Sequence, residues 1–259
     1  MSLPKNLSQF DTLVNIVAKL RAPDGCPWDR EQTHSSLRES LLEECYEVLE
    51  ALDEGDSEKL SYELGDLLMQ VVLHAQIASE AGEFELKDVI KSINTKLINR
   101  HPHVFGSAKA KDAKEVLHNW EALKKGERES EASMLDDVPK QMPALSYSQE
   151  IQSRVARVGF DWKDINGIVG KLAEEVNELK QVEGKEKIAG EFGDLLFTLV
   201  NIARRLGVDT ESALREANKR FYRRFAYMEK VCHKRGVNFA GLSFDEQNAL
   251  WEEAKKKVK

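Results

Sequence analysis

An acidic pattern that occurs twice constrains this chain more than any other feature. In each copy, a Glu-Glu-x-x-Glu segment is followed after a short interval by Glu-x-x-Asp. Carboxylates three or four positions apart lie on one face of a helix, so each copy predicts two acidic helices joined by a short connection. The copies consist of Glu43, Glu44, Glu47, Glu63 and Asp66, and of Glu174, Glu175, Glu178, Glu191 and Asp194.

Two such helices bring four or five carboxylates into one small space, where bound cations must offset their repulsion. Ligands that are all oxygen select a hard ion, so we expect Mg²⁺, with Mn²⁺ as a substitute, and not zinc. An isolated acidic motif is more typical of a solvated helix face. However, the whole set is duplicated, and Asp66 and Asp194 each precede a long apolar run that favours burial.

A di-iron helical bundle is an alternative, because it also places glutamates on facing helices. That design needs Glu-x-x-His on two of its helices. The chain has two such tetrapeptides, Glu31–His34 and Glu115–His118, but both lie outside the acidic motifs and have no counterpart in the second half. The pattern therefore favours Mg²⁺ and, with it, phosphate chemistry.

The composition describes a folded protein that neither spans a membrane nor coats nucleic acid. The 259 residues are 41% hydrophobic and 32% charged, with a formal net charge of −7. The three cysteines form no Cys-x-x-Cys pair, and the first 21 residues contain no apolar core of a signal peptide. We expect a cytoplasmic protein.

Apolar residues recur with helical spacing in both halves, and no segment shows convincing alternation with a period of two, so the expected fold is all-α. A polar, acidic stretch with two prolines spans residues 126–143 and is typical of a linker. The flanking regions match each other, as in Ser40–Glu50 with Lys171–Gln181 and Glu63–Leu68 with Glu191–Leu196. We therefore predict two related helical modules, residues 1–125 and 144–259.

Phosphate binding also needs cations. The second module offers Lys171 and Lys187 close to the acidic pairs, and Arg220 and Arg224 one helical turn apart. Trp251 with Lys255 either offers an aromatic face and a charge to a nucleotide or packs a terminal helix onto the core. In the first module the corresponding residues are Lys59, Lys96, Arg100, Trp120 and Lys124.

Taken together, these motifs resemble those of the MazG-type nucleoside triphosphate pyrophosphohydrolases. The resemblance covers nearly the whole chain. It rests on the duplicated acidic pairs, on Cys26-Pro27-Trp28-Asp29, on Arg100–Phe105 and on Val158–Trp162. The Cys-Pro-Trp-Asp segment itself predicts a structured turn with a packed indole.

The resemblance implies an all-α, tightly associated and intertwined homodimer that hydrolyses NTPs or dNTPs, ATP among them, to the monophosphate and pyrophosphate with Mg²⁺. The metal ligands that it implies are Glu175, Glu178, Glu191 and Asp194, with a second candidate set of Glu44, Glu47, Glu63 and Asp66. The nucleotide contacts that it implies are Lys171, Lys187, Arg220, Arg224, Trp251 and Lys255. We expect catalysis in the second module, because the position of Lys171 is occupied by Ser40 in the first module, which therefore lacks this cation for binding phosphate.

For the reaction, we expect Glu174, Glu175 and Glu178 to be the catalytic carboxylates, with Glu174, or a carboxylate freed from coordination, taking a proton from the attacking water. Two other functions remain open at this point. One is a regulatory module that binds Mg²⁺–nucleotide without hydrolysing it, and the other is a purely structural helical dimer. The sequence separates binding from hydrolysis poorly, because both need the same groups.

Overall fold

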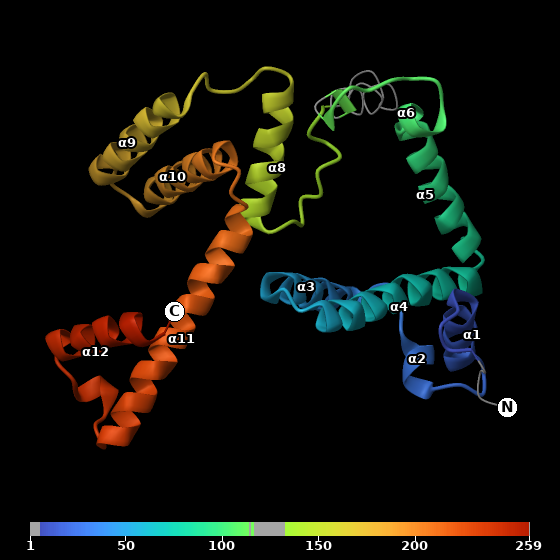
Figure 1. The fold of residues 1–259 in the computed structure, drawn as a ribbon, viewed down its shortest axis with the longest axis horizontal. Coiled ribbons are helices and arrows are strands. Elements are labelled where there is room, and N and C mark those ends of the chain that lie inside the picture. The colour runs from blue at the N-terminus through green and yellow to red at the C-terminus, as the bar shows by residue number, and fades with distance from the viewer. Residues whose placement is uncertain (1–5, 114, 117–132, 259) are drawn as a thin grey trace. The chain divides into compact units, whose positions relative to one another are not determined.

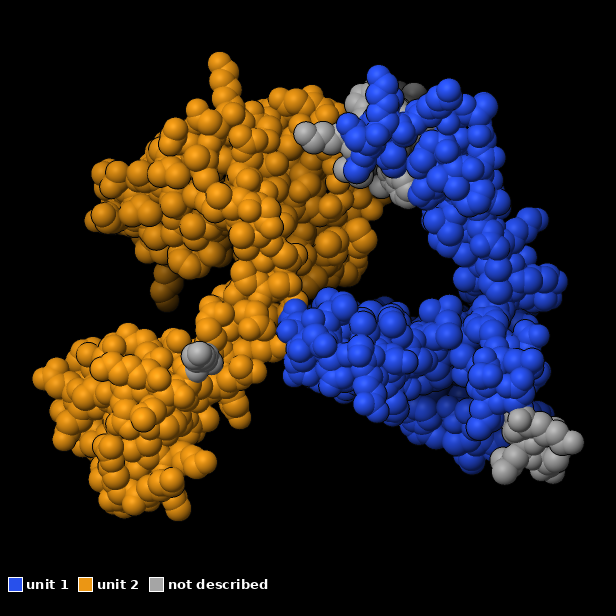
Figure 2. Space-filling view, in the orientation of Figure 1, with its two compact units in different colours: residues 1–123 blue, residues 124–259 orange. Residues whose placement is uncertain are grey.

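The structure is a computed structural model that describes residues 6–113, 115–116 and 133–258. Every regular element in these ranges is a helix, which confirms the predicted all-α class (Figure 1). The chain divides into two compact units, residues 1–123 and 124–259, which are coloured separately in Figure 2. The predictions for Trp120, Lys124, His118 and linker residues 126–132 lie outside the described residues.

Unit 1 is built around a helical hairpin in which α3 and α4 pack against each other. The turn between them is tight because Gly55, with φ 67°, ends α3 in the left-handed conformation that glycine adopts readily. The Asp56 side chain then accepts hydrogen bonds from the backbone N–H groups of Glu58 and Lys59 at the start of α4. The helices of this unit are α1 (Phe10–Arg21), α2 (Pro27–Glu31), α3 (Arg38–Glu54), α4 (Ser57–Ala81), α5 (Leu86–Arg100) and α6 (Pro102–Phe105).

Helix α1 packs on α4, and a small core of Val17, Leu37, Val72 and Leu73 lies between them. The segment around α2 is held by polar contacts instead, since Arg21 pairs with Glu80 and donates to the carbonyl oxygens of Asp29 and Gln32.

The packed indole predicted for the Cys-Pro-Trp-Asp segment is wrong, because Trp28 is 62% exposed. Pro27 opens the single helical turn of α2, which leaves the Trp28 ring outside the core.

Unit 2 repeats the hairpin with α9 and α10 and adds α8 against α10. Asp164 caps α9 by accepting from the backbone N–H groups of Asn166 and Gly167. Its helices are α8 (Ala144–Arg157), α9 (Ile165–Gln181), α10 (Lys185–Arg205), α11 (Thr210–Arg235) and α12 (Phe244–Lys257), with a 3₁₀ turn, η1, at Phe239–Gly241.

The described end of the predicted linker packs onto α8. Val138 is fully buried, and the largely buried Arg154 pairs with Asp137 and donates to the carbonyl oxygen of Met134. Residues 133–138 therefore pack as part of unit 2.

Helix α12 packs on the C-terminal part of α11 around Met228, Cys232, Leu250 and Ala254. Figure 1 shows α12 beside the end of α11 that points away from α9 and α10. None of the described helices combines the length and the apolar composition needed to cross a bilayer.

Candidate functional site

Three carboxylates from α9 and α10 form what we call the C-terminal acidic cluster: Glu175, Glu178 and Glu191. Each offers one oxygen, and these oxygens all lie within 4.8 Å of one another. Glu175 is the most enclosed of the three, being only 4% exposed. Asp194, the fourth predicted ligand, lies one helical turn beyond Glu191 and lines the same pocket as Glu175. The structure thus brings together the two acidic motifs of the second module.

Lys171 lies against this cluster. Its ammonium nitrogen is 2.9 Å from an oxygen of Glu174 and 2.9 Å from an oxygen of Glu175. These hydrogen bonds, the one to Glu174 first, raise the pKa of Lys171, so its charge is fixed at physiological pH. Glu174 itself is exposed and faces Lys171 rather than the three clustered acids.

The cluster has the dimensions and the chemistry of a site for a small hard cation. Opposite ligands of Mg²⁺ lie about 4.2 Å apart, because each is about 2.1 Å from the ion. Neighbouring ligands lie about 3.0 Å apart, so oxygens that are within 4.8 Å of one another need their separations shortened by less than about 2 Å. The donors are all carboxylate oxygens, the ligand type that suits Mg²⁺ and Mn²⁺.

Unit 1 contains the matching N-terminal acidic cluster of Glu44, Glu63 and Asp66, whose oxygens also lie within 4.8 Å of one another. Glu47, which was predicted as a ligand, is not one of these three but is close enough to act on two of them. Burial raises the pKa of Glu44, and the nearby carboxylates of Asp66 and Glu47 raise it further. A hydrogen bond donated by Gln70 opposes this shift in part. Burial, then Glu47 and Asp66, likewise raise the pKa of Glu63.

Lys59 does not lie on the N-terminal acidic cluster in the way that Lys171 lies on the other. Its ammonium group binds Glu50 and Glu54 at the end of α3, 2.7 and 3.0 Å away. Gln70, a neutral side chain, takes the place beside Glu44, with 3.5 Å between its Nε2 atom and the carboxylate. No sequence motif marks Gln70, so its place beside Glu44 could not be predicted from the sequence.

In both Glu-x-x-Asp motifs a glycine precedes the aspartate: Gly65 before Asp66 on α4, and Gly193 before Asp194 on α10. A Cβ atom built on Gly65 or on Gly193 would meet nothing within 4 Å. A glycine in the interior of a helix costs about 1 kcal/mol relative to alanine. Both positions are therefore open, and no packing contact within the described chain requires glycine there.

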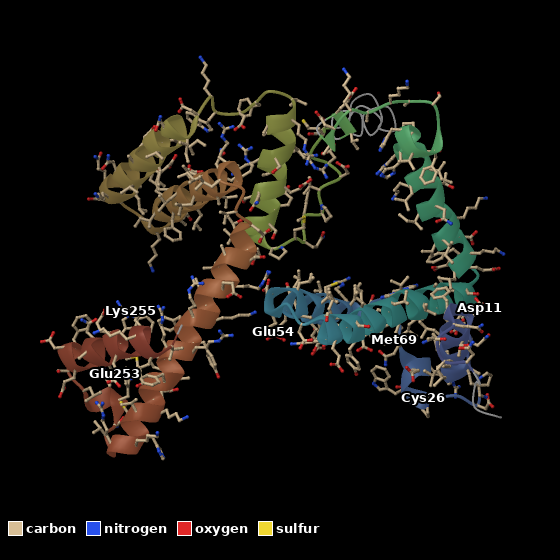
Figure 3. The ribbon with its side chains drawn as sticks, viewed as in Figure 1. Asp11, Cys26, Glu54, Met69, Glu253 and Lys255 are labelled. Carbon is tan, nitrogen blue, oxygen red and sulfur yellow. The ribbon has the colours of Figure 1, made fainter. Side chains whose placement is uncertain are left out.

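The predicted nucleotide-binding residues fall into two groups. Lys171 and Lys187 lie on the same helical hairpin as the C-terminal acidic cluster, Lys187 one turn before Glu191. The second group lies on α11 and α12 and consists of Arg220, Arg224, Trp251 and Lys255. Figure 3 labels Lys255 on α12. No described contact joins this second group to the acidic cluster within one chain.

Trp251 packs α12 against α11, which is one of the two alternatives that the sequence predicted. Its ring lies 5.3 Å from the ring of Phe221, and the guanidinium carbon of Arg224 is 5.8 Å from its centre. Lys255 pairs with Glu252 on the same helix. A nucleotide contact by these side chains remains a prediction.

A pocket of about 780 Å³ opens beside the C-terminal acidic cluster, and we call it the α8–α10 pocket. Glu175, Asp194 and Lys171 line it, together with apolar and aromatic side chains. The sequence analysis noted the Val158–Trp162 motif but gave its residues no role. Phe160, Asp161 and Trp162 all line the pocket, so this motif was the part of the sequence from which the pocket could have been predicted.

The residues of the di-iron alternative take no part in the described acidic clusters. His34 instead stacks on His74, with 2.8 Å between their Nδ1 atoms and ring planes within 1° of parallel. Burial, followed by the neighbouring His34, lowers the pKa of His74.

Comparisons with known proteins place the chain. A MazG nucleotide pyrophosphohydrolase domain matches residues 32–105, which include the N-terminal acidic cluster. The chain is 47% identical over 247 residues to a protein of Thermotoga maritima named nucleoside triphosphate pyrophosphohydrolase/pyrophosphatase MazG, with 95% of each chain covered. The chain belongs to the MazG family.

Two further relatives also match nearly the whole chain. The nucleoside triphosphate pyrophosphohydrolase of Escherichia coli K12 is 43% identical over 258 residues, which cover 96% of this chain and 98% of that protein. An uncharacterised protein of Bacillus subtilis, YabN, is 47% identical over 252 residues, which cover 95% of this chain but 52% of YabN. The MazG relationship thus extends through both units of the chain.

Proposed function

We propose that this MazG protein is a nucleoside triphosphate pyrophosphohydrolase that converts an NTP or dNTP and water to the monophosphate and pyrophosphate. One observation carries the proposal: three carboxylates of α9 and α10 converge within 4.8 Å, beside Lys171 and a pocket large enough for a nucleoside. The names of the relatives from Thermotoga maritima and Escherichia coli support the same reaction.

Glu175, Glu178 and Glu191, with Asp194, would hold Mg²⁺, and Mn²⁺ could replace it. The close oxygens and the all-carboxylate donor set support this assignment. When bound, the ion shields the charge of the triphosphate and acidifies water.

The protein's own residues divide the remaining work. Glu174, or a clustered carboxylate that is free of the metal, accepts a proton from the attacking water as the water oxygen bonds to the α-phosphorus. The bond from that phosphorus to the bridging oxygen breaks, and pyrophosphate leaves with the electron pair. Lys187, which lies one turn before Glu191, stabilises the negative charge of the departing group.

We further propose that a second copy of the chain completes the site. Arg220, Arg224 and Trp251 lie on α11 and α12, and within one chain no described contact takes them to the acids. Large apolar side chains on α10 and α11 are exposed, among them Phe192 at 50% and Phe221 at 58%. Such surfaces are typical of subunit interfaces, so a homodimer accounts for both observations. A net charge of −7 and three free cysteines support a cytoplasmic enzyme that does not bind nucleic acid.

Product analysis tests the reaction. Purified protein with Mg²⁺ and each NTP should yield monophosphate and pyrophosphate, and Glu178→Ala should abolish this while the helical circular-dichroism spectrum is retained. Glu183→Ala, which removes an exposed acid outside the cluster, is the matched control and should remain active. Release of diphosphate and phosphate, or turnover by Glu178→Ala, would contradict the proposal. Nucleotide binding without any product would indicate a regulatory module instead.

Complementation tests the second copy. Glu178→Ala and Arg224→Ala should each be inactive alone, but mixed subunits form hybrids in which one of the two composite sites is intact. Random mixing should therefore restore roughly a quarter of the wild-type activity. If the mixture stays inactive although light scattering shows a dimer, both groups of residues act within one chain.

A further inference from the structure

We propose that the α8–α10 pocket holds the nucleoside of the substrate, and that the side-chain oxygen of Gln152 accepts a hydrogen bond from an N–H group of the base. The inference rests on the proposed function, because it takes the triphosphate to lie at the C-terminal acidic cluster. It adds the part of the protein that recognises the base.

The pocket is continuous with the acids. One stripe of α10 lines it from Asp194 to Arg204, through positions 197, 198 and 201. The ten steps from residue 194 to residue 204 rise about 15 Å along the helix. Glu175 and Asp194 mark the acidic end, so a triphosphate bound there leaves the rest of the pocket to its nucleoside. The volume of about 780 Å³ lies within the range of small-molecule sites.

The aromatic side chain of Trp162 borders the pocket and is fixed in place. Trp162 is 42% exposed, and its indole lies where a side chain at Gly167 would be, only 2.8 Å from a Cβ built there. Asp161 anchors the same segment through ion pairs with Arg204 and Arg205. Burial alone would raise the pKa of Asp161, but these arginines, Arg204 foremost, lower it overall. A rigid indole with an open face suits stacking on a base.

Gln152 supplies the polar contact. It is 4% exposed and lines the pocket from α8. Its Nε2 atom donates to the carbonyl oxygen of Phe197 over 2.9 Å, which fixes the orientation of the amide because only the NH₂ group can donate. Its Oε1 atom is buried and has no hydrogen-bond partner among the described residues.

Buried acceptors without a partner are rare, and a ligand donor would satisfy this one. The base edges provide such donors: amino groups on adenine and cytosine, and ring N–H groups on guanine and uracil. An acceptor that any of these can reach favours broad use of bases. It disfavours a base that lacks the donor.

Two substrates that differ in one amino group provide the test: ATP and purine riboside 5′-triphosphate, both with Mg²⁺. For the wild type, we expect kcat/KM to be roughly tenfold higher for ATP, the effect of one unmatched buried acceptor. Gln152→Met keeps the length of the side chain but removes the acceptor, so this ratio should fall to about one. Gln149→Met is the control on the same helix, since Gln149 binds Thr210 and Val208 outside the pocket, and it should keep the ratio.

A tenfold ratio retained by Gln152→Met would overturn the role of Gln152, and an unchanged KM for ATP in Trp162→Ala would overturn the pocket. If no NTP yields pyrophosphate, the proposed function has failed, and calorimetric titration of the same two nucleotides still tests the pocket. A roughly tenfold difference in affinity that Gln152→Met abolishes would then support the inference, and equal affinities in the wild type would overturn it.

Discussion

The N-terminal and C-terminal acidic clusters derive from the same sequence motif but have different electrostatic surroundings. Lys171 lies on Glu175 in unit 2, whereas Ser40 takes its place in the sequence of unit 1 and Gln70, a neutral group, contacts Glu44. The pKa values of Glu44 and Glu63 are raised as a result of burial among other acids. One substitution on one helix face thus separates a cluster with a fixed cation from a cluster without one.

The surroundings also differ in the space beside the acids. In unit 2 the α8–α10 pocket reaches Glu175 and Asp194. A pocket of about 200 Å³ in unit 1 is lined by residues of α1, α4 and the start of α5, and none of the clustered acids lines it. The difference supports our proposal that unit 2 binds the substrate, while both units keep a set of oxygens suited to a cation.

The largest expected difference is in catalysis. Glu175→Gln should lower kcat/KM by at least about 10²-fold, because it removes a buried carboxylate from the site. The matched variant Glu44→Gln should change it less than about twofold, since the active cluster is intact. Steady-state release of pyrophosphate measures both. If Glu44→Gln has the larger effect, catalysis belongs to unit 1 and the comparison is reversed.

A smaller effect should follow from exchanging the cation. Lys171→Ala removes the ammonium group beside Glu175 and should raise KM for NTP roughly tenfold, the effect of one charge-assisted contact. Ser40→Lys places an ammonium one turn before Glu44 and should lower the pKa of that carboxyl. Carboxyl chemical shifts followed over pH measure the change. A pKa of Glu44 that does not move would show that Ser40 is not the counterpart of Lys171.

The smallest effect concerns stability and pH. The raised pKa of Glu44 means that the folded chain holds a proton more tightly than the unfolded chain, so stability falls as pH rises from the unfolded value of about 4.5 through the folded one. Glu44→Gln should therefore stabilise the chain at pH 7, by about 0.5 kcal/mol or roughly 2 °C, and have little effect at pH 4. Thermal unfolding at both values checks this. Glu175→Gln, which loses an ion pair with Lys171, should not stabilise at pH 7.

Much of the fold followed from short-range pattern. Helical spacing predicted the hairpins, and carboxylates three or four residues apart on neighbouring helices predicted which acids would meet. Such patterns contain no information on contacts between distant helices. The hydrogen bond from Gln70 to Glu44 and the unpaired oxygen of Gln152 both depend on how two helices pack.

The same reason explains what was wrong or left unassembled. Trp28 is a large aromatic residue that sequence favours for a core, but its single-turn helix presents it outward. Arg220 and Arg224 have the right chemistry and helical spacing, yet spacing does not tell which helix, or which copy of the chain, their side chains face.

Gly65 and Gly193 have a consequence for engineering. Alanine at either position would meet no neighbour within 4 Å and should make its helix more stable by up to about 1 kcal/mol. Residues one or two positions apart on a helix do not face each other, so the added methyl group would point away from the neighbouring carboxylates. A search for thermostable variants can therefore begin at these two positions without changing the acids of either site.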